Sequence, residues 1–85
     1  MKNIKNQIIK NLCYTELVYH RINKKLAVDF SNNYIQLYIS KILNETSEEC
    51  IIKKGKNFYV TNQAYDIVIT INSNTFRVIT VDRIK

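Results

Sequence analysis

The chain is 85 residues long, has a formal net charge of +6 and has a pI near 9.5. A chain of this length has room for one hydrophobic core, so residues 1–85 are expected to form a single domain, and a hydrophobic content of 46% excludes a disordered chain. The positive charge either serves solubility or indicates a polyanionic partner, which would be nucleic acid or an acidic protein surface.

The two cysteines, Cys13 and Cys50, lie far apart in the sequence and show no CxxC spacing. Together with a single histidine they cannot supply the four ligands of a structural zinc site, so we expect free thiols, no bound metal and no cofactor. Polar residues interrupt the apolar positions near the N-terminus, which excludes a signal peptide and a membrane span. The expected location is therefore cytoplasmic, where thiols stay reduced.

Apolar residues recur at helical spacing near the start of the chain and predict a first helix from Asn3 to Leu12. Thr15 is a candidate N-cap for a second helix from Glu16 to about Leu26. In that helix His20 lies roughly opposite the apolar stripe, and Arg21 lies between the two faces.

A third helix is expected from Asn32 to Leu43, because apolar residues again recur at helical spacing there. Either Asp29 or Ser31 can cap its N-terminus. The polar and acidic stretch over residues 44–49 is typical of a loop. Residues 1–44 are thus expected to be the helical part of the domain.

From Cys50 onward the hydrophobic period changes from helical spacing to two, which predicts strands. Gly55 and Lys56 would form a two-residue turn, and glycine at the first central position is typical of a type II′ hairpin. Further turns are expected at residues 63–65 and 72–75. The strands so separated are Cys50–Lys54, Asn57–Asn62, Asp66–Ile71 and Phe76–Ile84.

These elements predict an α+β fold in which three N-terminal helices pack on one face of a four-stranded antiparallel meander formed by residues 50–85. Ile67, Ile69 and Ile71 alternate with polar or smaller residues and are expected beneath the helices. The other sheet face would be open to solvent. Most of the excess positive charge falls from residue 50 onward, so the basic surface is expected mainly on the sheet.

Cations of the predicted sheet are the first candidates for binding. Lys53, Lys54 and Lys56 surround a tight turn and could hold phosphates. Alternatively, these lysines protect an edge strand against aggregation. Arg77 and Arg83 add two guanidinium groups, which suit bidentate recognition of phosphate or carboxylate.

Three other kinds of side chain complete the candidate set. The ring of Tyr59 could stack on an unpaired base, since its side chain points to the face opposite that of its neighbour Phe58. Asn72 and Thr75 place polar groups in a turn, although local hydrogen bonding within the turn is sufficient to explain them. His20 is the only side chain whose ordinary pKa lies near neutrality, so it is either a proton-transfer group or a surface residue without a role.

Three segments carry a resemblance to a known family: NLCYTELVYHRINKKL, KKGKNFYVTN and ITINSNTFRVITVDRI. Together they resemble the bacterial and phage domain-of-unknown-function family 3781, which implies no established activity. More distantly, the final hairpin is similar to that of the barnase–EndoU–colicin–RelE superfamily of metal-independent ribonucleases, with Asn72, Thr75 and Thr80 as the matching residues.

The ribonuclease resemblance implies an active site on the open face of the sheet. By position, the helix-borne catalytic group would be Arg21 or His20, the basic strand residue would be Lys54 or Lys56, and Thr80 would supply the hydroxyl. In the nearer family the position of His20 often holds a small residue whereas the following arginine is kept. The resemblance therefore favours Arg21 over His20.

The sequence predicts a small basic protein that binds RNA or another polyanion through its open sheet face. It would act either as a metal-independent endoribonuclease of the toxin type or as a binder without cleavage. The alternative is a non-enzymatic protein-interaction module, such as a phage or mobile-element inhibitor that docks on an acidic partner. The oligomeric state is left open by the sequence.

Overall fold

The computed structural model describes residues 4–84 and has three helices, one short 3-10 helix and four strands in that order. The four strands form a single antiparallel sheet in the order β1-β2-β3-β4. The predicted α+β class, with helices followed by a meander, is confirmed. The elements are α1 (Ile4–Asn11), α2 (Glu16–Leu26), α3 (Asn32–Asn44), η1 (Glu48–Cys50), β1 (Ile51–Lys54), β2 (Asn57–Asn62), β3 (Ile67–Asn72) and β4 (Val78–Arg83).

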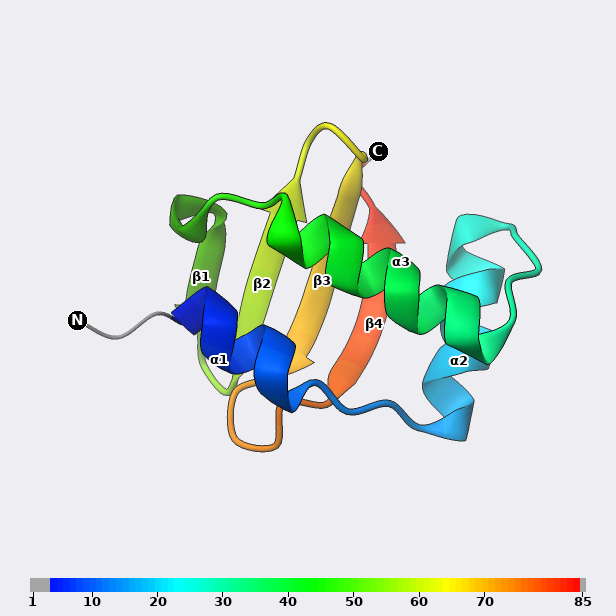
Figure 1. The fold of residues 1–85 in the computed structure, drawn as a ribbon, viewed down its shortest axis with the longest axis horizontal. Coiled ribbons are helices and arrows are strands. Elements are labelled where there is room, and N and C mark those ends of the chain that lie inside the picture. The colour runs from blue at the N-terminus through cyan, green and yellow to red at the C-terminus, as the bar shows by residue number, and fades with distance from the viewer. Residues whose placement is uncertain (1–3, 85) are drawn as a thin grey trace.

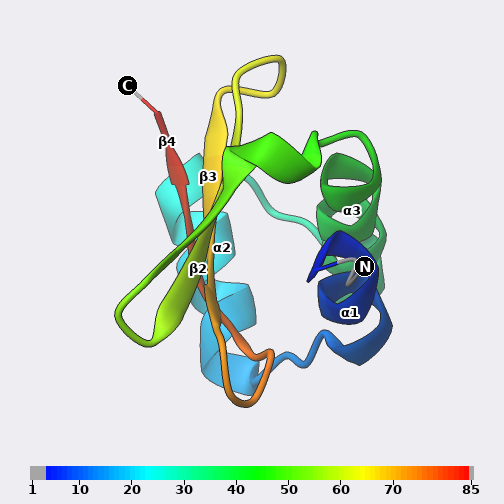
Figure 2. The same ribbon diagram turned by 90° about the vertical axis from the view of Figure 1, so that its left-hand side faces the viewer.

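The helices occupy two different positions relative to the sheet. α1 and α3 lie side by side across one face, whereas α2 lies beside β4 at the side of the sheet (Figures 1 and 2). The face opposite α1 and α3 is open to solvent, as Figure 2 shows in the edge-on view. We call this side of the sheet the open face.

Both helix caps expected from the sequence are present. The Thr15 hydroxyl accepts a hydrogen bond from the backbone N–H of Val18 at 3.3 Å, and the Ser31 hydroxyl accepts one from Tyr34 at 3.1 Å. Each bond satisfies an N–H group that a helix start leaves without a helical partner. α2 ends at Ala27, which adopts a left-handed conformation with φ of 58°. The second helix therefore begins and ends at the predicted residues.

Several predicted boundaries differ by one or two residues. α1 ends at Asn11 rather than Leu12, and the predicted start at Asn3 lies outside the described residues. Cys50 was expected to begin the first strand but instead closes the 3-10 turn η1, where its N–H donates to the carbonyl of Ser47 at 2.9 Å.

The third and fourth strands begin later than predicted because two residues have positive φ, which is incompatible with a strand. Asp66 has φ of 60°, so β3 begins at Ile67. Phe76 has φ of 59°, and β4 begins only at Val78. The turn at Gly55 has φ of 63° and is followed by β2 after one further residue, as a type II′ hairpin requires.

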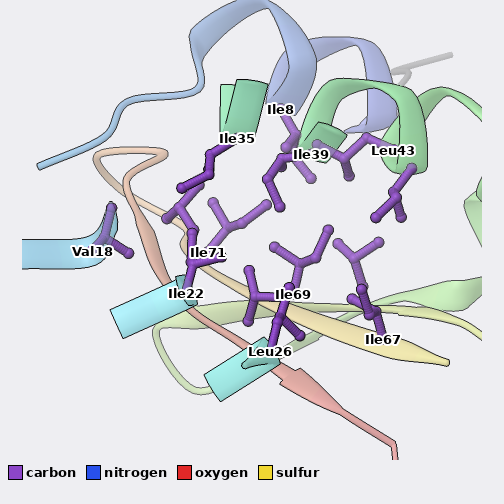
Figure 3. Packing of buried hydrophobic residues seen from close by; sticks show 14 of the residues in the cluster. Ile8, Val18, Ile22, Leu26, Ile35, Ile39, Leu43, Ile67, Ile69 and Ile71 are labelled. Carbon is purple, nitrogen blue, oxygen red and sulfur yellow. The ribbon is translucent and has the colours of Figure 1, made fainter. Parts of the chain in front are cut away.

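The core lies between the sheet and the helices. Ile67, Ile69 and Ile71 are all at most 1% exposed, so the prediction that this face of β3 lies beneath the helices is confirmed. Figure 3 shows the side chains of α2 and α3 directed toward them. Burial of each large aliphatic side chain contributes about 1.5–3 kcal/mol. Other completely buried members of this cluster are Ile8, Ile22, Ile35, Ile39, Ile42, Leu43, Val60 and Val81.

A buried polar network joins the end of α3 to β2. The Asn62 amide donates to the Thr46 hydroxyl at 2.9 Å, and that hydroxyl donates to the carbonyl of Ile42 at 2.6 Å. The Asn62 side-chain oxygen also accepts from the N–H of Tyr65 at 3.2 Å. Because these groups are hydrogen-bonded, their burial costs far less than that of unpaired polar groups. The Lys5 ammonium donates to the Thr46 carbonyl at 2.9 Å and so complements the C-terminus of α3.

The segment between α1 and α2 pairs directly with the beginning of β4. The Cys13 N–H donates to the Phe76 carbonyl and the Val78 N–H donates to the Cys13 carbonyl, both at 2.9 Å. The two bonds form an isolated parallel bridge between Cys13 and Arg77. This connection between the two ends of the chain was not predicted from the sequence.

From this bridge α2 runs parallel to β4. The Arg21 guanidinium donates to the Ile79 carbonyl at 3.5 Å, and the Arg83 guanidinium donates to the Leu26 carbonyl at 3.0 Å. Between them Lys25 and Asp82 form an ion pair with an N–O distance of 2.9 Å. The β4 edge of the sheet is therefore covered by α2, whereas the β1 edge is not.

Tyr14 has a buried hydroxyl without a hydrogen-bond partner among the described residues. Its ring stacks on that of Tyr19, with centroids 5.5 Å apart, whereas the Tyr19 hydroxyl accepts from the Gln36 amide at 2.6 Å. Burial, and to a lesser extent the neighbouring Tyr19, raises the pKa of Tyr14 above its ordinary value of 10.0.

We expect Tyr14→Phe to leave the free energy of unfolding unchanged or higher at neutral pH, because the change removes an unpaired buried hydroxyl. Because the pKa of Tyr14 is raised in the folded protein, the unfolded chain ionises at a lower pH than the folded one. The contribution of Tyr14 to the free energy of unfolding is therefore complete below pH 10 and is lost as the pH rises further. The variant should therefore lose less stability than the wild type above about pH 10. Urea denaturation at neutral and alkaline pH measures both effects.

The matched control is Tyr19→Phe, which removes a hydroxyl that accepts a hydrogen bond and should cost about 1 kcal/mol at neutral pH. An equal cost for the two variants at neutral pH would contradict this account of Tyr14.

Candidate polyanion-binding surface

The open face carries mainly neutral polar side chains. On β3 its positions are Val68, Thr70 and Asn72, which alternate with the buried isoleucines; Thr70 is itself buried, and the other two are half-buried. Cross-strand pairing extends these three positions into rows across the sheet. The rows are Lys54–Asn57–Asn72, Ile52–Tyr59–Thr70–Thr80 and Thr61–Val68–Asp82.

The three lysines around the first hairpin do not lie on one surface. Lys54 is exposed in the first row of the open face, and Lys56 is exposed in the adjoining turn. Lys53 pairs with the buried Phe58 and so lies on the helix side, where it lines a hollow of about 350 Å³ that Glu48 also lines. The structure thus places Lys54 on the open face and Lys56 in the turn beside it, and separates Lys53 from Lys54.

Arg83 lies on the helix side of the sheet. It pairs with the buried Ile67, and its guanidinium satisfies the Leu26 carbonyl at the C-terminus of α2. Burial raises the pKa of the nearby Tyr38, and the positive charge of Arg83 partly opposes that shift. Arg83 therefore supports the α2–β4 contact rather than the open face.

Asn72 and Thr75 are engaged within their turn. The Asn72 side-chain oxygen accepts from the N–H groups of Asn74 and Thr75 at 2.8 and 2.9 Å. The Thr75 hydroxyl accepts from the N–H of Arg77 at 3.3 Å. Both side chains therefore stabilise the turn, and this role is sufficient to explain why Asn and Thr occur there.

Two candidates lie in the central row of the open face. Tyr59 is half-buried between Ile52 and Thr70, and its hydroxyl accepts from the Asn57 amide at 3.5 Å. Thr80 pairs with Thr70 beside a bulge, and its hydroxyl is enclosed with no hydrogen-bond partner among residues 4–84. A phosphate would reach the Thr80 hydroxyl only if neighbouring side chains moved.

Arg21 and Arg77 meet where α2 borders the open face. Both line a hollow of about 410 Å³, which we call the α2–β4 hollow. A second hollow of about 620 Å³ is lined by α2 alone, through His20, Arg21, Lys24 and Lys25. The residues lining the α2–β4 hollow are Thr15, Leu17, Val18, Arg21, Arg77, Val78 and Ile79.

The open face is therefore bordered by cations on two sides rather than centred on one cluster. Lys54 and Lys56 lie at the β1 side and Arg21 and Arg77 at the β4 side. Three strand spacings, about 14 Å, separate the backbones of β1 and β4. The side chains predicted to share one catalytic site thus fall into two groups.

No group of three or more His, Cys, Asp or Glu side chains within residues 4–84 is arranged to hold a metal ion. Cys13 and Cys50 are both exposed free thiols. None of the helices described here is long and apolar enough to cross a membrane.

Comparison with known proteins places the chain in a family. The family described as "Protein of unknown function (DUF3781)" matches residues 6–82. The chain belongs to the DUF3781 family. Among curated proteins and among solved structures, nothing matches it.

The DUF3781 match reaches from the first turn of α1 to Asp82 in β4, so it includes both segments that form the α2–β4 hollow. The resemblance to this family seen in the sequence is confirmed. Both arginines were candidates from the sequence, but that they line one hollow was not foreseen, because they lie far apart in the chain. The sheet face on which Lys53 lies could have been predicted, because Lys53 stands opposite the apolar Phe58 in the β1–β2 hairpin.

For this DUF3781 chain we expect Asn72→Ala to lower the free energy of unfolding by about 1–2 kcal/mol, because two backbone N–H groups lose their acceptor. Asn74→Ala is the matched control, since Asn74 enters this network through its backbone alone and should be nearly neutral. Urea denaturation of both variants provides the measurement. If Asn72→Ala is as stable as the wild type, the turn does not need the Asn72 side chain, which is then again a candidate for ligand contact.

Proposed function

We propose that this protein binds single-stranded RNA across the open face of its sheet. The observation that carries the proposal is the distribution of charge. Cations stand at both borders of the face, and the one carboxylate in its rows, Asp82, is already paired with Lys25. A polyanion lying across the face would meet positive charge on both sides and no unpaired negative charge between them.

Single-stranded rather than duplex RNA fits the centre of the face. Tyr59 is flanked by Ile52 and Thr70, so a base has an aromatic ring and neighbouring apolar surface to pack on. Unpaired bases can be stacked in this way, whereas the bases of a duplex are occupied by their own stacking. Ile52 is 60% exposed and is therefore available to such a base.

A more specific proposal is that the protein also cleaves the RNA that it binds. The distant resemblance to metal-independent ribonucleases supports it. In that chemistry the 2′-hydroxyl loses its proton and its oxygen attacks the adjacent phosphorus. The bond to the 5′-oxygen breaks, that oxygen takes up a proton, and the products are a 2′,3′-cyclic phosphate and a 5′-hydroxyl. His20 could take the proton from the 2′-hydroxyl, and Arg21, which lines the same hollow, could stabilise the charged intermediate. Lys54 would then position a phosphate of the bound strand at the β1 border, and Thr80 would contribute only after the side chains that enclose its hydroxyl move.

A second candidate function is a non-enzymatic interaction module. It is favoured by exposed apolar side chains on α3, on the side away from the open face. Leu37 is 69% and Tyr34 is 48% exposed, and both line a hollow of about 350 Å³ with Tyr38, Lys41 and Tyr65. Aromatic residues of this kind are enriched at protein interfaces.

We expect oligouridine to bind with an affinity that falls steeply with salt, each phosphate contact contributing about −0.7 to the logarithmic slope. Lys54→Ala and Arg77→Ala should each weaken binding and reduce that slope by about 0.7. Lys41→Ala, an exposed charge change on α3, should leave both quantities unchanged. Fluorescence anisotropy over a salt series measures them, and an absence of binding at about 50 mM salt would leave the interaction module as the function.

For cleavage we expect a 2′,3′-cyclic phosphate product that forms in the presence of a metal chelator and is absent when the substrate is 2′-deoxy. His20→Ala should slow the reaction by about 10²–10⁴-fold and Arg21→Ala by about 10²–10³-fold. Lys41→Ala is again the control. Intact RNA in the presence of folded protein that binds it would reduce the proposal to binding without cleavage.

A further inference from the structure

The α2–β4 hollow concentrates positive charge without a compensating acid. Two of its seven lining residues are arginines and none is acidic. The one ion pair among residues 4–84, between Lys25 and Asp82, involves neither arginine. A guanidinium group cannot lose its proton in a protein, so both charges persist at any physiological pH.

The Arg21 side chain and the Arg77 backbone each make contacts that place these residues at the hollow, whereas the Arg77 side chain is exposed. The Arg21 guanidinium donates to the Ile79 carbonyl at 3.5 Å. The backbone of Arg77 is fixed by three neighbours, because its N–H donates to Thr75, its carbonyl accepts from Asn72 at 2.9 Å, and it is bridged to Cys13. The two guanidinium groups carry like charges at one hollow, and an anion bound between them would be attracted by both.

The hollow also adjoins the beginning of α2. Thr15 caps that helix, and Leu17 and Val18 of its first turn line the hollow. The positive end of the helix dipole therefore lies beside the two arginines, and Glu16 in the same turn, which does not line the hollow, offsets part of it. Leu17 is 76% exposed at this position and offers apolar surface beside the charged groups.

The position of the hollow relative to the open face follows from the ion pair. Asp82 lies in a row of the open face, and its partner Lys25 comes one helical turn after Arg21 on α2. Arg21 and Lys25 therefore lie on the same side of the helix. A strand crossing the open face could end at the hollow.

We propose that the α2–β4 hollow binds a phosphate monoester. Two guanidinium groups and a helix start match the charge of a monoester, about −1.5 to −2 at neutral pH, better than the single charge of a phosphodiester. In the complex with RNA, the hollow takes a terminal phosphate of the strand, and this part of the inference rests on the proposed function. The monoester itself is either that terminal phosphate or the phosphate of a free nucleotide.

The first arm of the test uses small probes. Isotope-labelled full-length protein is titrated with uridine 5′-monophosphate, uridine 3′-monophosphate and uridine, and amide shifts are followed by NMR. We expect both monophosphates to shift the amides of Leu17, Val18 and Val78, and uridine to shift none of them. Arg77→Ala and Arg21→Gln should each weaken the monophosphate effect by about tenfold or more, as loss of a charge-assisted contact does.

The second arm compares oligouridines that carry a 5′-phosphate, a 3′-phosphate or hydroxyl groups at both ends. A strand with the accepted terminal phosphate should bind about tenfold more tightly than the hydroxyl-ended strand. Arg77→Ala should abolish that difference, whereas Lys54→Ala should weaken all strands by the same factor and preserve it. Circular dichroism of each variant establishes that it is folded.

The outcomes separate this inference from the proposed function. Amide shifts with a monophosphate, without binding of any oligouridine, would support the site and overturn RNA binding. Equal binding of all three oligouridines, with no monophosphate shift at the hollow, would overturn the site and leave RNA binding intact.

Discussion

The arrangement of this protein depends on the pair of backbone hydrogen bonds at Cys13. They fasten the α1–α2 connection to the start of β4 and direct α2 along that strand. Because α2 follows β4, Arg21 reaches the Ile79 carbonyl and lies in one hollow with Arg77. The hydrogen bonds involve main-chain atoms only, so the identity of the side chain at this position is not what creates the bridge.

The same arrangement makes the two edges of the sheet unequal. α2 covers β4, whereas β1 is a four-residue strand with no element beyond it among the described residues. Exposed lysines on a short edge strand discourage pairing with another chain, so the edge-protecting interpretation of Lys53 and Lys54 is compatible with a binding role for Lys54. One residue can protect the edge by its charge and attract phosphate by the same charge.

Local chemistry made much of the fold predictable. The caps at Thr15 and Ser31, the glycine turn at Gly55 and the alternation in β3 are all encoded within a few residues. The Cys13 bridge was not predictable in this way, because backbone pairing between distant segments leaves no side-chain pattern. The hollow that Arg21 and Arg77 share depends on that bridge and was therefore not predictable either. Phe76 was assigned to the last strand, but it has a positive φ, a conformation that is uncommon for a residue other than glycine and that its side chain does not indicate.

The Cys13 bridge also has a consequence for the order of folding. Each hairpin of the meander joins neighbouring segments, whereas the bridge closes a loop that contains most of the chain and so carries the larger entropic cost. Contacts of such high sequence separation slow folding, and we therefore expect α2 to dock on β4 after the hairpins form. The α2–β4 hollow exists only once that step is complete, which makes it a feature of the native state alone.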